Sequence, residues 1–259
     1  IWVYDVASAT LSQLTFGGTN VRPTWSPDGA RVAYWSNRSD GEGLYWVPAD
    51  RSGPEERVID GEEIGTSATF WTRDGAWIVI DGDAPDSGRV DEDVFAVETG
   101  AGHKVVPAVA TPGDEQTGAV SPDGKWIAYS TDEGGQRQVY LRPFLREGGR
   151  WLISTGPGMT PLWTSNDEVV YIDPQARTLV AARLELGSTV RVTGREAVLA
   201  WESYRSNVSA PAYDASRDGQ RFLVLRGTGG SQRGIEPVVV LNWFEEVKRR
   251  MAAQGGRPE

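Results

Sequence analysis

The chain has 259 residues, with 36 acidic and 26 basic side chains and a formal net charge of -10 at pH 7. Nucleic-acid binding needs a basic surface, so this balance excludes nucleic acid as an expected partner. The absence of cysteine excludes disulfides and thiolate metal sites, and no apolar run reaches the ~20 residues that span a bilayer, so no membrane insertion by this segment is expected. The 31 Gly, 15 Pro and 11 Trp are typical of an all-β protein.

In chain order, residues 1–15 first predict two strands, Ile1–Val6 and Leu11–Thr15. A motif of short strand, tight turn and longer strand then recurs. Its copies are PTWSPDGARVAYWS from Pro23, ATFWTRDGAWIVID from Ala68, GAVSPDGKWIAYS from Gly118, AYDASRDGQRFLVLR from Ala212, and a degraded copy, PLWTSNDEVVYID, from Pro161. A period of about 40–50 residues is typical of one four-stranded propeller blade.

The turn chemistry explains the recurring residue types. Pro27 sets φ near -65° at the second turn position, Asp28 accepts local backbone N–H groups, and Gly29 tolerates a positive φ. The strand that follows each turn is apolar on both faces, as expected of a blade packed between two neighbours.

Each copy is followed by a third strand and most by a fourth. The predicted third strands are Leu44–Val47, Val94–Val97, Val139–Phe144, Leu179–Leu184 and Val238–Trp243. The predicted fourth strands are Glu56–Ile59, Lys104–Val106, Trp151–Ser154 and Val190–Leu199. We therefore expect a six-bladed β-propeller of four-stranded antiparallel blades over residues 1–241, with an incomplete first blade.

The β pattern ends near Asn242, which can cap a helix with Glu245 as its capping-box partner. Trp243, Val247 and Met251 fall on one face of that helix. We predict a short amphipathic helix over residues 242–253 that packs on the propeller, with docking to a partner as the alternative. Residues 254–259 are predicted to form a disordered tail.

The SPDG hairpins resemble the TolB-like family of six-bladed propellers over nearly the whole chain. The ending, YDASRDGQRFLVLR followed by PVVVLNWFEEVKRR, is similar to the C-terminal end of the propeller region of many bacterial eukaryotic-like serine/threonine kinases. This resemblance implies a sensor-like propeller in an extracytoplasmic location, periplasmic or on the outer side of the inner membrane. No kinase nucleotide-loop or catalytic-loop motif occurs in the chain, so kinase activity is not assigned to these residues.

Because a propeller fold hosts many activities, function has to be sought in its loops. The SPDG turns are expected on one face and the loops of the channel mouth on the other. We expect a non-catalytic site at this mouth for a protein, peptide or small-molecule ligand. Its candidate residues are Asn20, Arg22, Arg38, Ser67, Asp91, Glu115, Gln116, Trp201, Arg205 and Asn207.

The tryptophans divide into two groups by their place in the repeat. Those next to the turns recur from copy to copy, which predicts a packing role. They are Trp25, Trp71 and Trp163 before the turn, and Trp77 and Trp126 after it. Trp201 breaks the repeat and is therefore the better candidate for ligand contact.

Two other functions stay open: a hydrolase with a carboxylate site at the channel mouth, with or without a divalent metal, and a purely structural spacer. His103 is the only histidine and no GxSxG motif occurs, which disfavours a Ser-His-Asp enzyme. No catalytic residue is assigned.

We expect no cofactor. A cluster of acidic residues makes calcium the alternative. Asp81, Asp83 and Glu92 match the first, third and twelfth positions of a calcium loop. Pro85 and Asp86 break the match, because Asp86 replaces the glycine that the turn needs.

Overall fold

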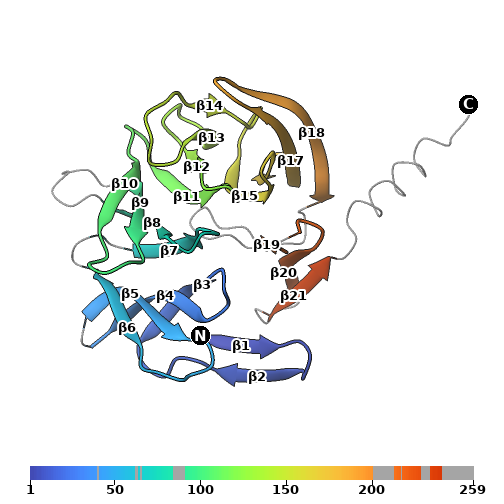
Figure 1. Ribbon diagram of the computed structural model, residues 1–259. Helices are drawn as coiled ribbons and strands as arrows, with labels where there is room; N and C mark the ends of the chain where they lie inside the picture. The colour runs from blue at the N-terminus through green and yellow to red at the C-terminus, as the bar shows by residue number, and fades with distance from the viewer. Residues whose placement is uncertain are drawn as a thin grey trace, which may run out of the picture.

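The computed structural model describes residues 1–39, 41–61, 64, 66–83, 91–200, 213–216, 218–228 and 234–240. These residues form six antiparallel sheets, of which four have four strands, one has three and one has two. The sheets are arranged around a central axis, as Figure 1 shows. The predicted six-bladed propeller with an incomplete first blade is confirmed.

The strands follow one another from the axis outward in each complete sheet. The first sheet contains β1 (Trp2–Asp5) and β2 (Thr10–Gln13). The second contains β3 (Thr19–Trp25), β4 (Arg31–Arg38), β5 (Gly41–Pro48) and β6 (Glu56–Asp60). The third contains β7 (Thr66–Trp71), β8 (Trp77–Asp83), β9 (Glu92–Glu98) and β10 (Val105–Val109).

The second half of the chain repeats this order. The fourth sheet contains β11 (Glu115–Val120), β12 (Trp126–Thr131), β13 (Gln138–Pro143) and β14 (Trp151–Leu152). The fifth contains β15 (Met159–Ser165), β16 (Glu168–Asp173), β17 (Thr178–Leu186) and β18 (Val190–Ala200). The last contains β19 (Tyr213–Ala215), β20 (Phe222–Thr228) and β21 (Gly234–Val240). We call β3, β7, β11, β15 and β19 the inner strands.

The SPDG turns close by a set of short hydrogen bonds. In the first copy the Ser26 hydroxyl donates to Asp28 at 2.6 Å, and Asp28 accepts the backbone N–H of Ala30 at 2.9 Å. Gly29 has a φ of 72°, which a side chain would strain. Equivalent bonds form at the turns after β7, β11 and β19. These bonds explain why Ser or Thr, Asp and Gly recur there.

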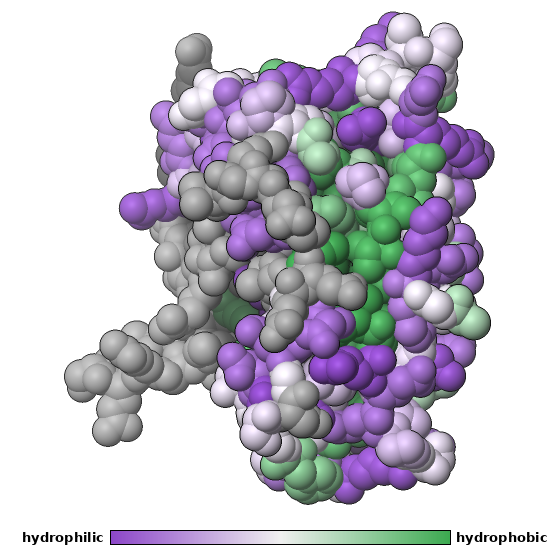
Figure 2. Space-filling model, turned by 90° about the vertical axis from the view of Figure 1, so that its left-hand side faces the viewer, coloured by the Kyte–Doolittle hydropathy of each residue, from purple (hydrophilic) through white to green (hydrophobic). Residues whose placement is uncertain are grey.

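The core lies between neighbouring sheets. Residues 32–36 of β4 are all buried, so both faces of this strand are covered. One hydrophobic cluster joins Trp46 of the second sheet to Trp71 of the third, with ring centroids 5.8 Å apart. The outer surface is mostly hydrophilic when viewed from the side of β6 and β10, with a band of hydrophobic residues across it (Figure 2). The two-sided burial expected from the sequence is confirmed.

The predicted packing role of the tryptophans is correct for Trp71 and Trp163, which are 7% and 4% exposed. It is wrong for Trp25, which is 49% exposed. Trp71 stacks on Trp46 of the preceding sheet, and the indole of Trp163 donates to the carbonyl of Ala119 in its preceding sheet. The sheet before Trp25 has only β1 and β2, so it offers no inner strand for the same contact.

The last strand begins at Gly234, four residues earlier than predicted, and pairs with β20 through to Val240. The predicted helix 242–253 and tail 254–259 lie outside the described residues. The described residues contain no helix, and so none that is long and apolar enough to cross a membrane.

Candidate binding site in the central channel

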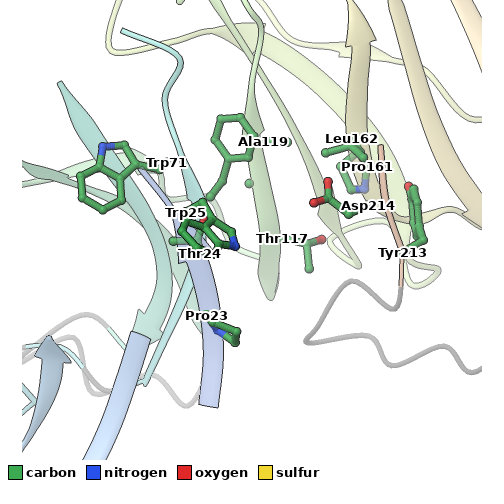
Figure 3. A pocket seen from close by; sticks show the side chains of 12 residues that line it. Pro23, Thr24, Trp25, Trp71, Thr117, Ala119, Pro161, Leu162, Tyr213 and Asp214 are labelled. Atoms are coloured by element: carbon green, nitrogen blue, oxygen red, sulfur yellow. The ribbon is translucent and has the colours of Figure 1, made fainter. Parts of the chain in front are cut away.

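The inner strands enclose a cavity of about 320 Å³ in the central channel, which we call the channel pocket. Small-molecule sites have volumes of about 300–1,000 Å³, so this cavity is large enough to hold a ligand. Figure 3 shows side chains from several sheets around it. Five lining residues hold the same place in the repeat, two positions before the Ser or Thr of the turn: Thr24, Phe70, Ala119, Leu162 and Asp214.

A second cavity of about 260 Å³ lies next to the channel pocket on the side of the SPDG turns. Five residues line both cavities: Trp25, Phe70, Trp71, Leu162 and Asp214. The channel therefore offers two adjoining spaces, with these five side chains at the junction.

Asp214 is the one charged residue among the described residues that line the channel pocket. Its carboxylate points into the pocket (Figure 3), and the side chain is open to solvent there. Protein surrounds it on most sides, and this partial desolvation raises the pKa of Asp214, while a 2.8 Å hydrogen bond from the Ala215 N–H opposes the rise. The described part of the lining thus has one negative point and is otherwise uncharged.

Near the mouth the inner strands carry irregularities. Arg22, Thr117 and Thr160 hold equivalent places, and each has a left-handed φ of 50–55°. The strand register shifts at each of them, as in a β-bulge. The freed N–H of Thr117 donates at 2.9 Å to Asp81 of the neighbouring sheet. These bulges therefore aim backbone groups across the gap between sheets.

Asp81 is fully buried and forms a charged cluster with Arg22 and Glu92. Desolvation raises the pKa of Asp81 to about 7; the N–H of Thr117 opposes this rise, Glu92 adds to it and Arg22 opposes it. Desolvation also raises the pKa of Glu92, and the charge of Asp114 adds to that effect. Three residues predicted from the sequence are thus brought together next to the mouth.

Asp114 and Gln116 extend this cluster. The side-chain amide of Gln116 donates to Asp114 at 3.2 and 3.3 Å. Arg137 pairs with the same carboxylate at 2.5 Å and lies 3.7 Å from Asp132. Gln116 is only 6% exposed, so its contacts are mainly within the protein.

Other predicted site residues are held by partners elsewhere. Asn20 donates to the hydroxyl of Thr15 and the carbonyl of Gly17. Glu115 is fully buried, and its carboxylate accepts three hydrogen bonds, from the N–H and hydroxyl of Thr111 and the hydroxyl of Thr131.

Arg38 is held by contacts of its own, among them a 2.9 Å hydrogen bond to the hydroxyl of Ser36. It pairs with Glu55 at 2.6 Å, donates to the hydroxyl of Tyr34 at 3.2 Å and lies 4.1 Å from the ring centroid of Tyr45. These contacts hold the guanidinium among β4, β5 and the segment before β6.

For two of the remaining predicted residues, the structure gives the position in the fold. Asp91 is half-buried directly before β9, and Ser67 lies in β7. Trp201, Arg205 and Asn207 lie outside the described residues.

The proposed calcium ligands lie on one sheet. Asp83 faces Glu92 across β8 and β9, and Asp81 lies two residues before Asp83. Within the described part of the chain, no group of three or more His, Asp or Glu side chains has the arrangement of a metal site. Calcium binding at these residues stays a hypothesis.

His103 lies between β9 and β10, away from the channel. Its ring packs edge-on against Trp46 at 5.2 Å, and its Nε2 lies 3.7 Å from a carboxylate oxygen of Glu56. The contacts of the single histidine of the chain are therefore those of a packed residue at the outer part of the blade.

Sequence reasoning missed Asp214 as a site residue. The signal was present in the repeat, because the four equivalent positions carry Thr24, Phe70, Ala119 and Leu162. A carboxylate at a position that is otherwise uncharged marks a departure that the fold does not require.

Comparisons with known proteins agree with this architecture. The structure of TolB from Acinetobacter baumannii superposes with a TM-score of 0.67 at 14% identity, covering 92% of this chain and 61% of that one. The structure of a putative TolB from Agrobacterium tumefaciens gives 0.63 at 15% identity, covering 92% and 83%. At these identities the likeness shows the fold alone.

A peptidase is also similar in sequence to this chain. The uncharacterized peptidase YuxL of Bacillus subtilis is 25% identical over a region that covers 51% of this chain and 25% of YuxL. This chain therefore spans about a quarter of the length of that curated relative. The sequence model of the TolB beta propeller domain matches residues 1–195, and the chain belongs to this family.

Proposed function

We propose that this chain is a non-catalytic binding platform whose ligand, a protein, peptide or small molecule, enters the central channel. The observation that supports this is the channel pocket itself, where side chains from five sheets converge around a cavity of ligand size. Its lining is apolar with a few polar groups, which is typical of binding sites.

A hydrolase is the second candidate, because the chain resembles part of YuxL and because Asp81 and Glu92 form a carboxylate pair. Asp81 has the near-neutral pKa that suits an acid or base. It is, however, 0% exposed, so a substrate has no access to its oxygens. This burial favours the binding platform over the hydrolase.

We also propose where this platform works in the cell. The resemblance of residues 213–250 to kinase-attached propellers supports a role as the extracytoplasmic sensor region of a membrane-bound bacterial kinase. The match to the TolB beta propeller domain supports an extracytoplasmic location in the same way.

The platform can be tested with peptides selected from a random library for binding to the protein. Their binding is then measured to a variant whose channel is filled by a larger side chain. Thr24→Phe fills the channel with the residue that the next sheet carries at the same place, Phe70. We expect selected peptides to bind the original protein and to lose binding to Thr24→Phe. The matched control is Thr193→Phe on the exposed side of β18, which should bind as the original does.

Two results would contradict the proposal. Peptides that bind Thr24→Phe as well as the original protein would place recognition outside the channel. Recovery of no peptide at all would favour the structural spacer.

A further inference from the structure

The channel pocket has a charge that the fold does not demand. At the place of Asp214, the other four sheets with an inner strand carry Thr24, Phe70, Ala119 and Leu162. The blades therefore pack and turn with uncharged residues there. A carboxylate moved into a partly dry pocket loses hydration, which is a cost that the fold gains nothing from.

Within the described residues, Asp214 has no cationic partner. The groups that act on it are the surrounding protein, which removes solvent, and the N–H of Ala215. Arg73 lines the adjacent cavity on the turn side. Among the residues that the structure describes, no Lys or Arg pairs with this carboxylate where it faces the pocket.

The walls around this carboxylate suit an apolar stem. Phe70, Leu162 and Pro161 line the pocket, and Figure 3 shows Asp214 beside the last two in the view. The exposed indole of Trp25 also lines it, and an indole face attracts cations. A negative point set among aromatic and aliphatic groups is complementary to a cationic head on a hydrocarbon body.

We propose that the channel pocket takes a ligand bearing an alkylammonium or guanidinium group, which pairs with the carboxylate of Asp214 while its apolar stem lies against Phe70 and Leu162. This inference rests on the proposed function and specifies the chemistry of its ligand. Such a group is carried by lysine and arginine side chains, by a peptide amino terminus and by small amines.

Benzylamine and benzyl alcohol are a matched pair of probes, since they share one ring and stem and differ in charge. Titration of the protein with each, followed by NMR, should show benzylamine binding and benzyl alcohol binding about 10-fold or more weakly. Asp214→Asn should weaken benzylamine by about 10- to 100-fold while leaving benzyl alcohol unchanged. The amide keeps the acceptor for the Ala215 N–H, so folding is preserved.

Two further variants complete the test. Asp214→Leu introduces the residue found at Leu162 and should remove the preference for the amine. Glu185→Gln removes one carboxylate from the exposed part of β17, so it matches the change of net charge and should leave benzylamine binding unaltered.

Three results overturn the inference: equal binding of the two probes, benzylamine binding that survives Asp214→Asn, and no benzylamine binding at any soluble concentration. The proposed function fails separately. If the selected peptides still lose binding to Thr24→Phe, the channel is a binding site and only the cationic preference is wrong.

Discussion

The hydroxyl of Tyr213 on β19 donates a hydrogen bond of 2.5 Å to the carbonyl oxygen of Thr160 on β15, which joins two neighbouring sheets beside the channel. Both residues are buried. Tyr213→Phe leaves this carbonyl without that donor, so we expect the free energy of unfolding to fall by about 1–3 kcal/mol. Urea denaturation measures the loss. Tyr4→Phe, at a side chain 57% exposed on β1, is the control and should change nothing.

Two tryptophans at the same place in the repeat should differ widely in their contribution to stability. Trp163 is 4% exposed and donates to the carbonyl of Ala119 at 2.9 Å, whereas Trp25 is 49% exposed. We expect Trp163→Ala to cost about 3–5 kcal/mol because it leaves a cavity and an unpaired carbonyl. Trp25→Ala should cost much less. Equal losses in thermal or urea unfolding would show that Trp25 also packs.

The contrast between these tryptophans shows what a sequence repeat can predict. Strand, turn and strand recur because each turn is closed by hydrogen bonds within five residues, so the fold follows from local chemistry. The environment of Trp25 depends on another sheet, and the repeat carries no information on how many strands that sheet has. The architecture was therefore predictable, and the burial of each copy was not.

Some residues of the candidate site could likewise be predicted from the repeat and others could not. Glu115 and Arg38 have the polarity and position of ligand-contact residues, but their partners are Thr131 and Glu55, 16 and 17 residues away in sequence. The local sequence does not predict those pairings. Asp214, by contrast, could have been found by aligning the copies and asking which of them departs from an uncharged residue.

The SPDG turn gives a prediction about local hydrogen bonding. Ser121 is 1% exposed. Its hydroxyl donates a hydrogen bond to Asp123 at 2.7 Å and accepts hydrogen bonds from the backbone N–H groups of Trp126 and Lys125. Ser121→Ala removes all of these bonds, so we expect a loss of about 1–2 kcal/mol in urea unfolding. Ser188→Ala in the exposed turn between β17 and β18 is the control. A loss no larger than that of the control would mean that Pro122 and Gly124 suffice for the turn.

The raised pKa of Asp81 predicts how the free energy of unfolding depends on pH. Burial raises its pKa to about 7, whereas an unfolded aspartate titrates near pH 3.9, about three units lower. The folded protein therefore binds this proton more tightly than the unfolded chain does, so this group stabilises the fold fully below pH 4 and loses that effect as the pH rises to about 7. The contribution falls by up to about 1.4 kcal/mol per pH unit in this window.

Asp81→Asn should remove this slope. The unfolding free energy of the variant minus that of the original protein should therefore rise from pH 4 to 7 and then stay level. Urea unfolding at several pH values measures the difference, which cancels the opposite effects of the turn carboxylates, whose pKa values are lowered. Asp83→Asn, at an exposed side chain two residues away, is the matched control. A difference that stays constant from pH 4 to 7 would mean that the N–H groups of Thr117 and Gly118 and the charge of Arg22 keep the Asp81 carboxylate ionised in spite of its burial, since these groups favour its charged form.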